Sequence, residues 1–267
     1  MPNLLQGEIT KPALGYNRVM ATWIAHLRIA ENLLARIPGL DPGQFAIGNI
    51  APDAGIPDEK WEKFDPPPEV THFKRSQSVH KDIADLDFYR CYLADISPDD
   101  SGCFSFRLGY FFHLITDNLW TLDVGRPTTE RFAEQFAADE SFIWEVKEDW
   151  YGLDHIYVRE HPDSLYWRVF LDAEPFDGAE DRPASAELDF LPSQALPRQL
   201  RHIKSFYQRD DDEIKAMMSR PMIYLSRGAM DRFVEDATER LHVIYQVLWP
   251  TPPALDGKFS ALEFAES

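Results

Sequence analysis

Cysteine is scarce in this chain, and its scarcity excludes a fold built on disulfides. The two cysteines, Cys91 and Cys103, do not form a Cys-x-x-Cys pair. Two cysteines in 267 residues are no framework of the kind that holds small secreted domains together. Cys91 falls within an apolar helical pattern, so we expect it in the core. A hydrophobic core must hold the fold, and 44% hydrophobic residues are enough to build one.

Positive charge is also in short supply. The chain has 27 lysines and arginines against 45 aspartates and glutamates, which gives a formal net charge of −18. Without a cationic excess it cannot displace the counterions of nucleic acid or dock electrostatically on an anionic membrane. We therefore expect no nucleic-acid partner, and we interpret the acidity as a contribution to solubility.

Long apolar runs are missing as well. No stretch of about 18 apolar residues occurs, so the sequence predicts no membrane span. Residues 1–16 lack the basic segment and the following apolar stretch that are typical of a secretory signal. We therefore expect a cytoplasmic protein, whose oligomeric state the sequence does not indicate.

What the chain does have is apolar residues at helical spacing over most of its length. Thr22 is expected to cap the first helix, which stops at Pro38-Gly39, and Asp41-Pro42 opens a second, short one. The sequence shows no internal repeat and no alternation typical of a sheet. It therefore predicts an all-α fold, a single-domain bundle of packed helices over residues 1–267, with irregular tails at residues 1–17 and 250–267.

The expected helices cover much of the chain between these tails. Residues 54–71, which include three consecutive prolines, and residues 173–187 are expected to be loops. Pro221 marks a break in the last helical stretch. The helices are expected at about residues 22–37, 42–47, 76–96, 104–122, 128–160, 163–170, 193–208 and 211–248.

The most informative segment is 109–120, an apolar stretch that predicts a buried helix. His113 and Asp117 are four residues apart in it, so their side chains share one helix face. A buried helix has little reason to carry such a pair unless something satisfies it. An imidazole and a carboxylate together suit an ion such as zinc, but a hydrogen bond between them would also satisfy the pair. The segment alone leaves both interpretations open.

Three more polar side chains stand in defined or apolar surroundings. Asp53 follows Pro52 at the end of a short apolar segment, as a ligand or as an ordinary turn aspartate. His72 ends the proline-rich loop, as a ligand or as packing. His26 lies among apolar neighbours in the first helix, where a core histidine is the commoner role. Three histidines and two carboxylates suit two closely spaced divalent ions, with Asp117 bridging them; zinc, manganese and iron all accept such ligands.

The order of these segments resembles the zinc-dependent phospholipase C family. Residues 21–34, 48–53, 71–73 and 109–120 carry the resemblance, which covers roughly residues 20–122. It implies an all-α protein that binds two or three zinc ions and hydrolyses phosphodiester bonds. It also implies a zinc site formed by Asp53, His72, His113 and Asp117. Asp117 would bridge to a second zinc bound by His26, and Asp53 would accept a proton.

The chain departs from the family's secreted enzymes at three points. Those enzymes use the amino group of an N-terminal tryptophan, whereas Trp23 is internal, so the second ion lacks a ligand or takes another. The third zinc needs a later His/His/Glu set. The chain offers Glu145, Asp149, Asp154 and His155 without a clean match, and Glu145 and Asp149 favour a solvated acidic face. No lipid-binding domain follows in the sequence, so attack on membrane phospholipid is not expected.

Two functions follow from these residues. The first is a metal-dependent hydrolase that acts on a small-molecule phosphoester through a dinuclear, zinc-type site. The second is a non-catalytic helical protein that binds a structural ion or a partner, which the missing ligand of the second ion favours. A zinc ion coordinated by four protein ligands is structural, and one with an open position for water is catalytic.

Overall fold

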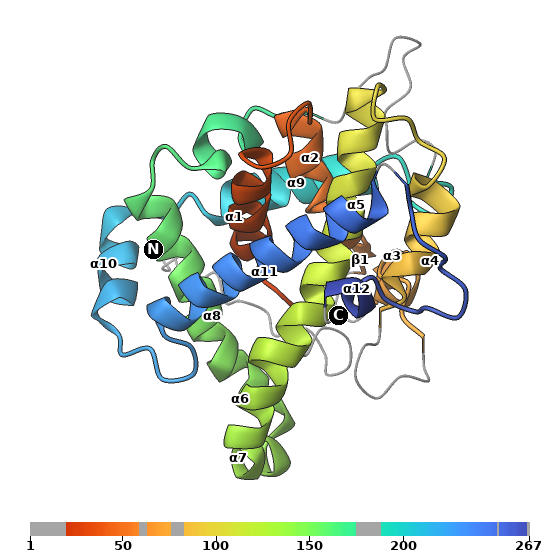
Figure 1. Cartoon of the computed structure of the whole chain (residues 1–267). Helices are drawn as coiled ribbons and strands as arrows, with labels where there is room; N and C mark the ends of the chain where they lie inside the picture. Colours follow the sequence, from red (N-terminus) through yellow and green to blue (C-terminus); the bar gives the residue numbers. More distant parts are fainter. Residues whose placement is uncertain (1–19, 59–62, 76–82, 175–187, 250, 266–267) are drawn as a thin grey trace.

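The computed structural model describes residues 20–58, 63–75, 83–174, 188–249 and 251–265. Within these ranges the chain is predominantly helical, with one short hairpin, so the all-α prediction is confirmed (Figure 1). The predicted tail at residues 1–17, the start of the expected helix 76–96 and most of the expected loop 173–187 lie outside the described residues. No helix in the described part of the chain combines the length and apolar character needed to cross a bilayer.

The longer helices supply most of the core. They are α1 (Trp23–Leu34), α2 (Pro42–Gly48), α5 (Ser101–Trp120), α8 (Ile143–Glu160), α9 (Ala195–Phe206), α10 (Asp211–Ser219) and α11 (Arg227–Leu248). The shorter α-helices are α3 (Pro68–Thr71), α4 (Asp85–Phe88), α6 (Arg126–Arg131), α7 (Ala133–Ala138) and α12 (Leu262–Ala265). Short 3-10 turns are η1 (Ala51–Asp53) and η4 (Glu140–Phe142), and π-helical turns are η2 (Tyr89–Leu93), η3 (Thr121–Gly125) and η5 (Tyr166–Phe170).

Helix α5 is the central element of the structure. Every residue from Phe104 to Trp120 is buried, which is the pattern of a helix surrounded by others. Helix α2 packs closely against it, α1 and α11 cover other sides, and Trp150 of α8 meets Trp120 at its C-terminal end. In Figure 1, α11 crosses in front of α5, and α6 and α7 project away from the rest of the molecule. The site described below forms where α1, α2 and α5 meet.

The predicted helix starts have identifiable caps. The Thr22 hydroxyl accepts a hydrogen bond from the backbone N–H of Ala25 at 3.4 Å, and Asp41 accepts one from Gln44 at 2.8 Å. Both caps are those expected from the sequence. Helix α5 begins three residues earlier than predicted because Asp100 accepts a hydrogen bond from the backbone of Cys103 and caps it there.

Three expectations need correction. The proline-rich segment contains a short antiparallel hairpin, β1 (Ile56–Pro57) paired with β2 (Phe64–Asp65), in addition to α3. Cys91 is exposed, since the turn η2 buries Tyr89 and Leu93 instead. The C-terminal segment is not wholly irregular. It includes α12, and buried Asp85 accepts hydrogen bonds from the Ser260 hydroxyl and from the backbone of Ala261, at 2.6 and 2.7 Å.

Candidate metal centre

Four segments bring the five predicted site residues together. His26 lies in the first turn of α1, which Thr22 caps. Asp53 ends η1, directly after α2, and His72 terminates α3. His113 and Asp117 lie one turn apart on α5. Their side chains are almost completely buried, except that of Asp53, which is 12% exposed. The site therefore opens to solvent at Asp53.

One atom each of Asp53, His113 and Asp117 lies close to Nε2 of His72, and we call these four residues the quartet. Nε2 of His72 lies 3.3 Å from Asp53 Oδ1, 3.5 Å from Asp117 Oδ2 and 3.3 Å from His113 Nε2. His113 Nε2 lies 3.3 Å from Asp117 Oδ2 and 4.0 Å from Asp53 Oδ1. A tetrahedral ion with bonds of about 2.0–2.2 Å has its ligand atoms roughly 3.3–3.6 Å apart. Four of the five distances fall in or next to that range.

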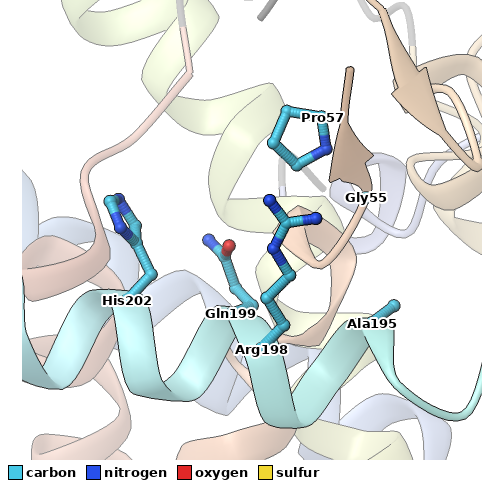
Figure 2. A pocket seen from close by; sticks show the side chains of 6 residues that line it. All are labelled: Gly55, Pro57, Ala195, Arg198, Gln199 and His202. Atoms are coloured by element: carbon cyan, nitrogen blue, oxygen red, sulfur yellow. The ribbon is translucent and has the colours of Figure 1, made fainter. Parts of the chain in front are cut away.

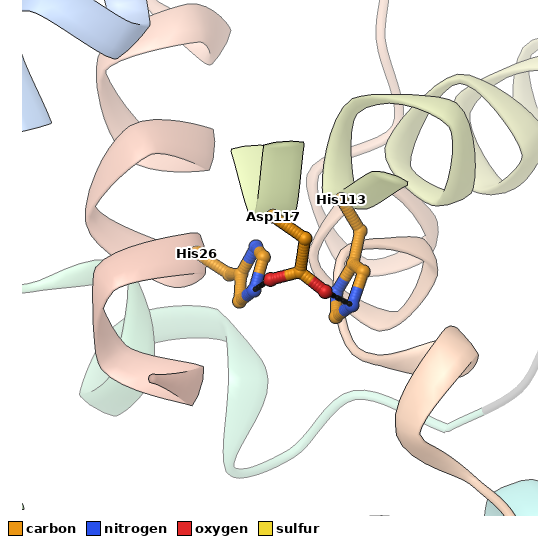
Figure 3. A group of neighbouring side chains, drawn as sticks. All are labelled: His26, His113 and Asp117. Carbon is orange, nitrogen blue, oxygen red and sulfur yellow. Dashed lines mark ion pairs between the residues drawn. The ribbon is translucent and has the colours of Figure 1, made fainter. Parts of the chain in front are cut away.

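The second oxygen of Asp117 points to His26. Asp117 Oδ1 lies 3.4 Å from His26 Nε2 and accepts a hydrogen bond from the backbone N–H of Ala21 at 3.0 Å. The His26 and His113 rings stack with their centroids 3.9 Å apart. Figure 3 shows the carboxylate of Asp117 between the two imidazoles. The carboxylate thus has one oxygen in the quartet and the other beside His26, the orientation that a bridging ligand needs.

Hydrogen bonds at the outer ring nitrogens orient two of the histidines. His113 Nδ1 donates to the backbone carbonyl of Asn49 at 2.8 Å, which leaves Nε2 free to bind. His72 Nδ1 lies 3.0 Å from the hydroxyl of Thr71, so its Nε2 also faces the quartet. The Tyr110 hydroxyl donates to the Thr71 carbonyl at 2.5 Å and ties this segment to α5. Such support at the far nitrogen is typical of metal-binding histidines.

The electrostatics favour a cation in this place. Burial lowers the pKa of His26 and that of His72, so both imidazoles are held neutral. Burial works against ionisation of the two carboxylates, but the neighbouring histidines outweigh it and lower the pKa of Asp53 and, more strongly, that of Asp117. Burial likewise opposes protonation of His113, yet the charge of Asp117 raises its pKa. The two ionised carboxylates and the neutral imidazoles of His26 and His72 are in the protonation states in which these groups bind metal, whereas His113 would release its proton on binding.

Unpartnered atoms give an independent test of the fit. His26 has no hydrogen-bond partner at either ring nitrogen, and Asp117 Oδ2 has none either. Leaving buried polar atoms unsatisfied costs free energy, and they usually have an explanation. The described residues form two groups that could hold a metal ion, one with His26, His113 and Asp117 and the other with Asp53, His72 and His113. The residues present therefore fit a metal, and these orphaned atoms disfavour a pair that simply satisfies itself.

Two side chains beside the site are not among the residues predicted from the sequence. The Trp23 indole N–H donates to Asp53 Oδ2 at 2.8 Å, which holds the carboxylate from the outside. Lys147 of α8 is only 6% exposed, and burial lowers its pKa to about 8 against the opposing charges of Asp53 and Asp117. Trp23 could have been suspected, because it precedes His26 by almost one helical turn. Nothing in the sequence around Lys147 indicates that α8 places it near the carboxylates.

The later candidates for a third ion do not converge. Asp154 accepts hydrogen bonds from the hydroxyls of Thr22 and Tyr207, each at 2.7 Å. Asp149 accepts the backbone N–H of Tyr224 at 2.6 Å, so it is buried and not part of a solvated face as predicted. Glu145 is exposed, as expected, and accepts a hydrogen bond from the Tyr224 hydroxyl. His155 packs between the rings of Phe206 and Tyr207. Asp149, Asp154 and Glu145 are thus paired within the protein, and His155 packs among aromatic rings with its Nδ1 unpartnered.

Comparison with known proteins agrees with the site's location. The family model described as zinc dependent phospholipase C matches residues 25–120. No curated protein and no solved structure matched the chain. The matched segment runs from α1 to the end of α5 and contains His26, Asp53, His72, His113 and Asp117, whereas Lys147 lies outside it. Residues 25–120 of this chain thus match the zinc-dependent phospholipase C family over the segment that carries all five predicted ligands.

Proposed function

We propose that this protein is a zinc-dependent hydrolase that cleaves a small phosphoester through two ions held by the five side chains. The observation that carries the proposal is the spacing within the quartet, in which three carboxylate or imidazole contacts of 3.3–3.5 Å surround His72 Nε2. These separations match those between the ligands of one tetrahedral ion. The match of residues 25–120 to a zinc-dependent family supports zinc as the metal.

The two ions would have different surroundings. The quartet would hold the first, and Asp117 would bridge to a second that His26 also binds. The second ion would then have fewer protein ligands, and its remaining positions would be open to water and substrate. Open coordination positions distinguish catalytic zinc sites from structural ones. When bound, such ions polarise a phosphoryl oxygen and lower the pKa of a water molecule toward neutrality.

The residues of the chain itself would position the substrate and move the proton. Asp53 is the most exposed of the five, so a substrate would approach from its side. Its Oδ2 accepts the Trp23 indole N–H and retains a lone pair that can take a proton from the attacking water. The ammonium of Lys147, in the field of Asp53 and Asp117, would attract the phosphate. A charge fixed before the reaction in a dry site stabilises the transition state well.

A structural role for the metal is the alternative, and one observation favours it. The quartet already offers four protein ligands, which would complete a tetrahedral site without an open position. In that case the ion would hold α1, α2, α3 and α5 together, and the protein would have no hydrolase activity. The two functions make different demands on the second ion, since only the catalytic one needs it.

Metal analysis combined with an ester panel tests the proposal. We expect purified protein to contain one or two equivalents of zinc, manganese or iron by elemental analysis. Metal-loaded protein should hydrolyse a soluble phosphodiester or phosphomonoester, and chelation followed by zinc should remove and restore the activity. Fully loaded protein that cleaves none of these esters would favour the structural ion. Protein that neither contains nor takes up metal would contradict both functions.

A further inference from the structure

A small pocket lies next to the candidate metal centre, between α9 and the segment that follows Asp53. Its volume is about 80 Å³, and its walls come from two elements. Figure 2 shows that the side chains of Arg198, Gln199 and His202 project from one side of α9 toward Gly55 and Pro57. Residues spaced by three and four positions share a helix face, so α9 presents these three polar groups together. We call this hollow the α9 pocket.

The α9 pocket adjoins the part of the metal centre that is open to solvent. Gly55 in its wall is two residues beyond Asp53, the most exposed of the five predicted ligands. Helix α9 packs directly on η1, which ends at Asp53. Trp23 links the two regions, because its indole donates to Asp53 and its ring meets the His202 ring edge-on at 5.7 Å. A molecule bound at Asp53 therefore has the α9 pocket beside it.

Two groups in the α9 pocket have unused hydrogen-bonding capacity. Within the part of the chain that the structure describes, Arg198 has no ion pair and the Gln199 amide has no hydrogen bond. This is notable in a chain with a net charge of −18, where acidic partners are abundant. A guanidinium offers a planar fork of donors that fits a carboxylate or a phosphate, and an amide adds a further N–H. The free donors in the α9 pocket thus match an anionic group.

The size of the α9 pocket limits what it can hold. At roughly 10–15 Å³ for each water, its volume gives room for about five to eight water molecules. That space suits one phosphate or carboxylate group and is too small for an acyl chain. His202 adds a neutral ring at the edge, because burial lowers its pKa and the charge of Arg198 acts in the same direction.

We propose that the α9 pocket binds a second anionic group of the substrate, a phosphate or carboxylate that the phosphoester carries in addition to its reacting phosphate. The inference rests on the proposed function, since it places the reacting phosphate at the metal centre. Arg198 would pair with the second anion and Gln199 would donate to it. The preferred substrate is then a small, doubly anionic phosphoester, and an uncharged alcohol as leaving group is disfavoured.

Binding of unreactive phosphonates tests the pocket without requiring turnover. The probes are propylphosphonate, 3-phosphonopropanoate and propane-1,3-bisphosphonate, with bisphosphonates of longer spacers to allow for the separation of the two sites. Affinity would be measured by isothermal titration calorimetry on metal-loaded protein. We expect the best probe with a second anion to bind about 10- to 100-fold more tightly than propylphosphonate, the gain typical of a hydrogen-bonded charge pair. The carboxylate and phosphonate arms show which anion is preferred.

Arg198→Ala is the informative variant, and Arg201→Ala is its matched control. Both arginines are exposed on α9, and neither has an ion pair among the described residues, but Arg201 does not line the pocket. Arg198→Ala should remove the advantage of the second anion and leave the affinity for propylphosphonate unchanged. Arg201→Ala should keep the advantage, which separates local recognition from a general effect of net charge. Melting temperatures of both variants should equal that of the wild type.

The possible results separate this inference from the proposed function. Equal binding of all probes to the wild type, or an equal loss in both arginine variants, would overturn the α9 pocket as an anion site. Hydrolysis of simple esters would then still support the hydrolase. Conversely, an advantage that depends on Arg198 supports the pocket even if no ester is cleaved, and only the catalytic role would be lost. Failure of every phosphonate to bind would overturn the pocket outright.

Discussion

His113 and His155 are both accompanied by an aspartate, but the two aspartates have different hydrogen-bond partners. Both histidines are buried, and each has a buried aspartate close to it in the sequence, Asp117 in one case and Asp154 in the other. Asp154 is saturated by the hydroxyls of Thr22 and Tyr207, and the His155 ring packs against aromatic rings. Around His113, by contrast, imidazole nitrogens and carboxylate oxygens face one another 3.3–3.5 Å apart.

The difference between these two regions lies in the donors that surround each carboxylate. A buried carboxylate that meets hydroxyl and backbone donors is satisfied by the protein, and it has no capacity left for an ion. A carboxylate that meets mainly imidazole nitrogens has no comparable supply of donors, since those nitrogens are themselves suited to bind metal. Residue type alone therefore does not identify a metal site, and the partners of each group do.

The largest expected effect concerns Asp53. Asp53→Asn should lower kcat/KM for phosphoester hydrolysis by at least about 10²–10⁴-fold, the usual contribution of a general base. The amide is nearly isosteric, so the fold should survive, but it cannot accept the proton and is a weaker ligand. Kinetics on a phosphodiester and a phosphomonoester, with metal content measured in parallel, would decide. Unchanged turnover would remove Asp53 from the mechanism.

Replacing each histidine in turn tests whether only His113 contributes to metal binding. His113→Ala should lower metal content and destabilise the protein by about 3 kcal/mol, the linkage expected for an ion at roughly 100 times its Kd. His155→Ala removes an equally buried imidazole and should leave metal content unchanged, although some packing is lost. Elemental analysis and thermal melts of both variants are the measurements. Equal metal content in the two variants would show that the two histidines do not differ in metal binding.

The surroundings of Asp154 should affect how stability depends on pH, and they should not affect metal binding. Burial raises the pKa of Asp154 to about 7 from an ordinary value of 3.8, so the folded protein holds this proton when the unfolded chain has lost it. The free energy of unfolding contributed by this group therefore decreases by about 1.4 kcal/mol for each pH unit between about 3.8 and about 7. Above about pH 7 this contribution no longer changes. Asp154→Asn keeps partners for both hydroxyls and should flatten this dependence, without loss of metal. Urea unfolding at several pH values would show it, and an unaltered pH profile would contradict it.

The smallest expected effect concerns Trp23, which supports the site from outside. Trp23→Phe keeps the aromatic packing against His202 but removes the indole donor to Asp53. We expect kcat to fall about tenfold with little change in KM, because residues that orient a ligand typically contribute about 10–100-fold. Trp167→Phe is the control, because the Trp167 indole donates to the backbone of Val158, and it should leave kcat unchanged. An equal fall in both variants would indicate general destabilisation.

Local signals in the sequence predicted much of the fold and the composition of the site. Thr22 and Asp41 were recognisable caps, and the spacing of His113 and Asp117 placed them on one helix face. The sequence could not predict the hairpin of β1 and β2 or the burial of Asp149, because both depend on segments that meet only in the folded chain. Lys147 belongs to the same class, since its approach to Asp53 and Asp117 depends on how α8 packs.

The close approach of α2 and α5 has a consequence for anyone who would transplant this site. A Cβ on Gly48 would lie 2.0 Å from the Phe106 carbonyl oxygen, and one on Gly109 would lie 2.5 Å from that of Phe45. Only bare backbone lets the two helices come near enough for the Asn49 carbonyl to reach His113. If the five ligands were grafted onto another helical scaffold without these glycines, the residue types would be correct. The imidazole of His113 would then lack the hydrogen bond that orients it. The portable unit is the helix pair with its ligands.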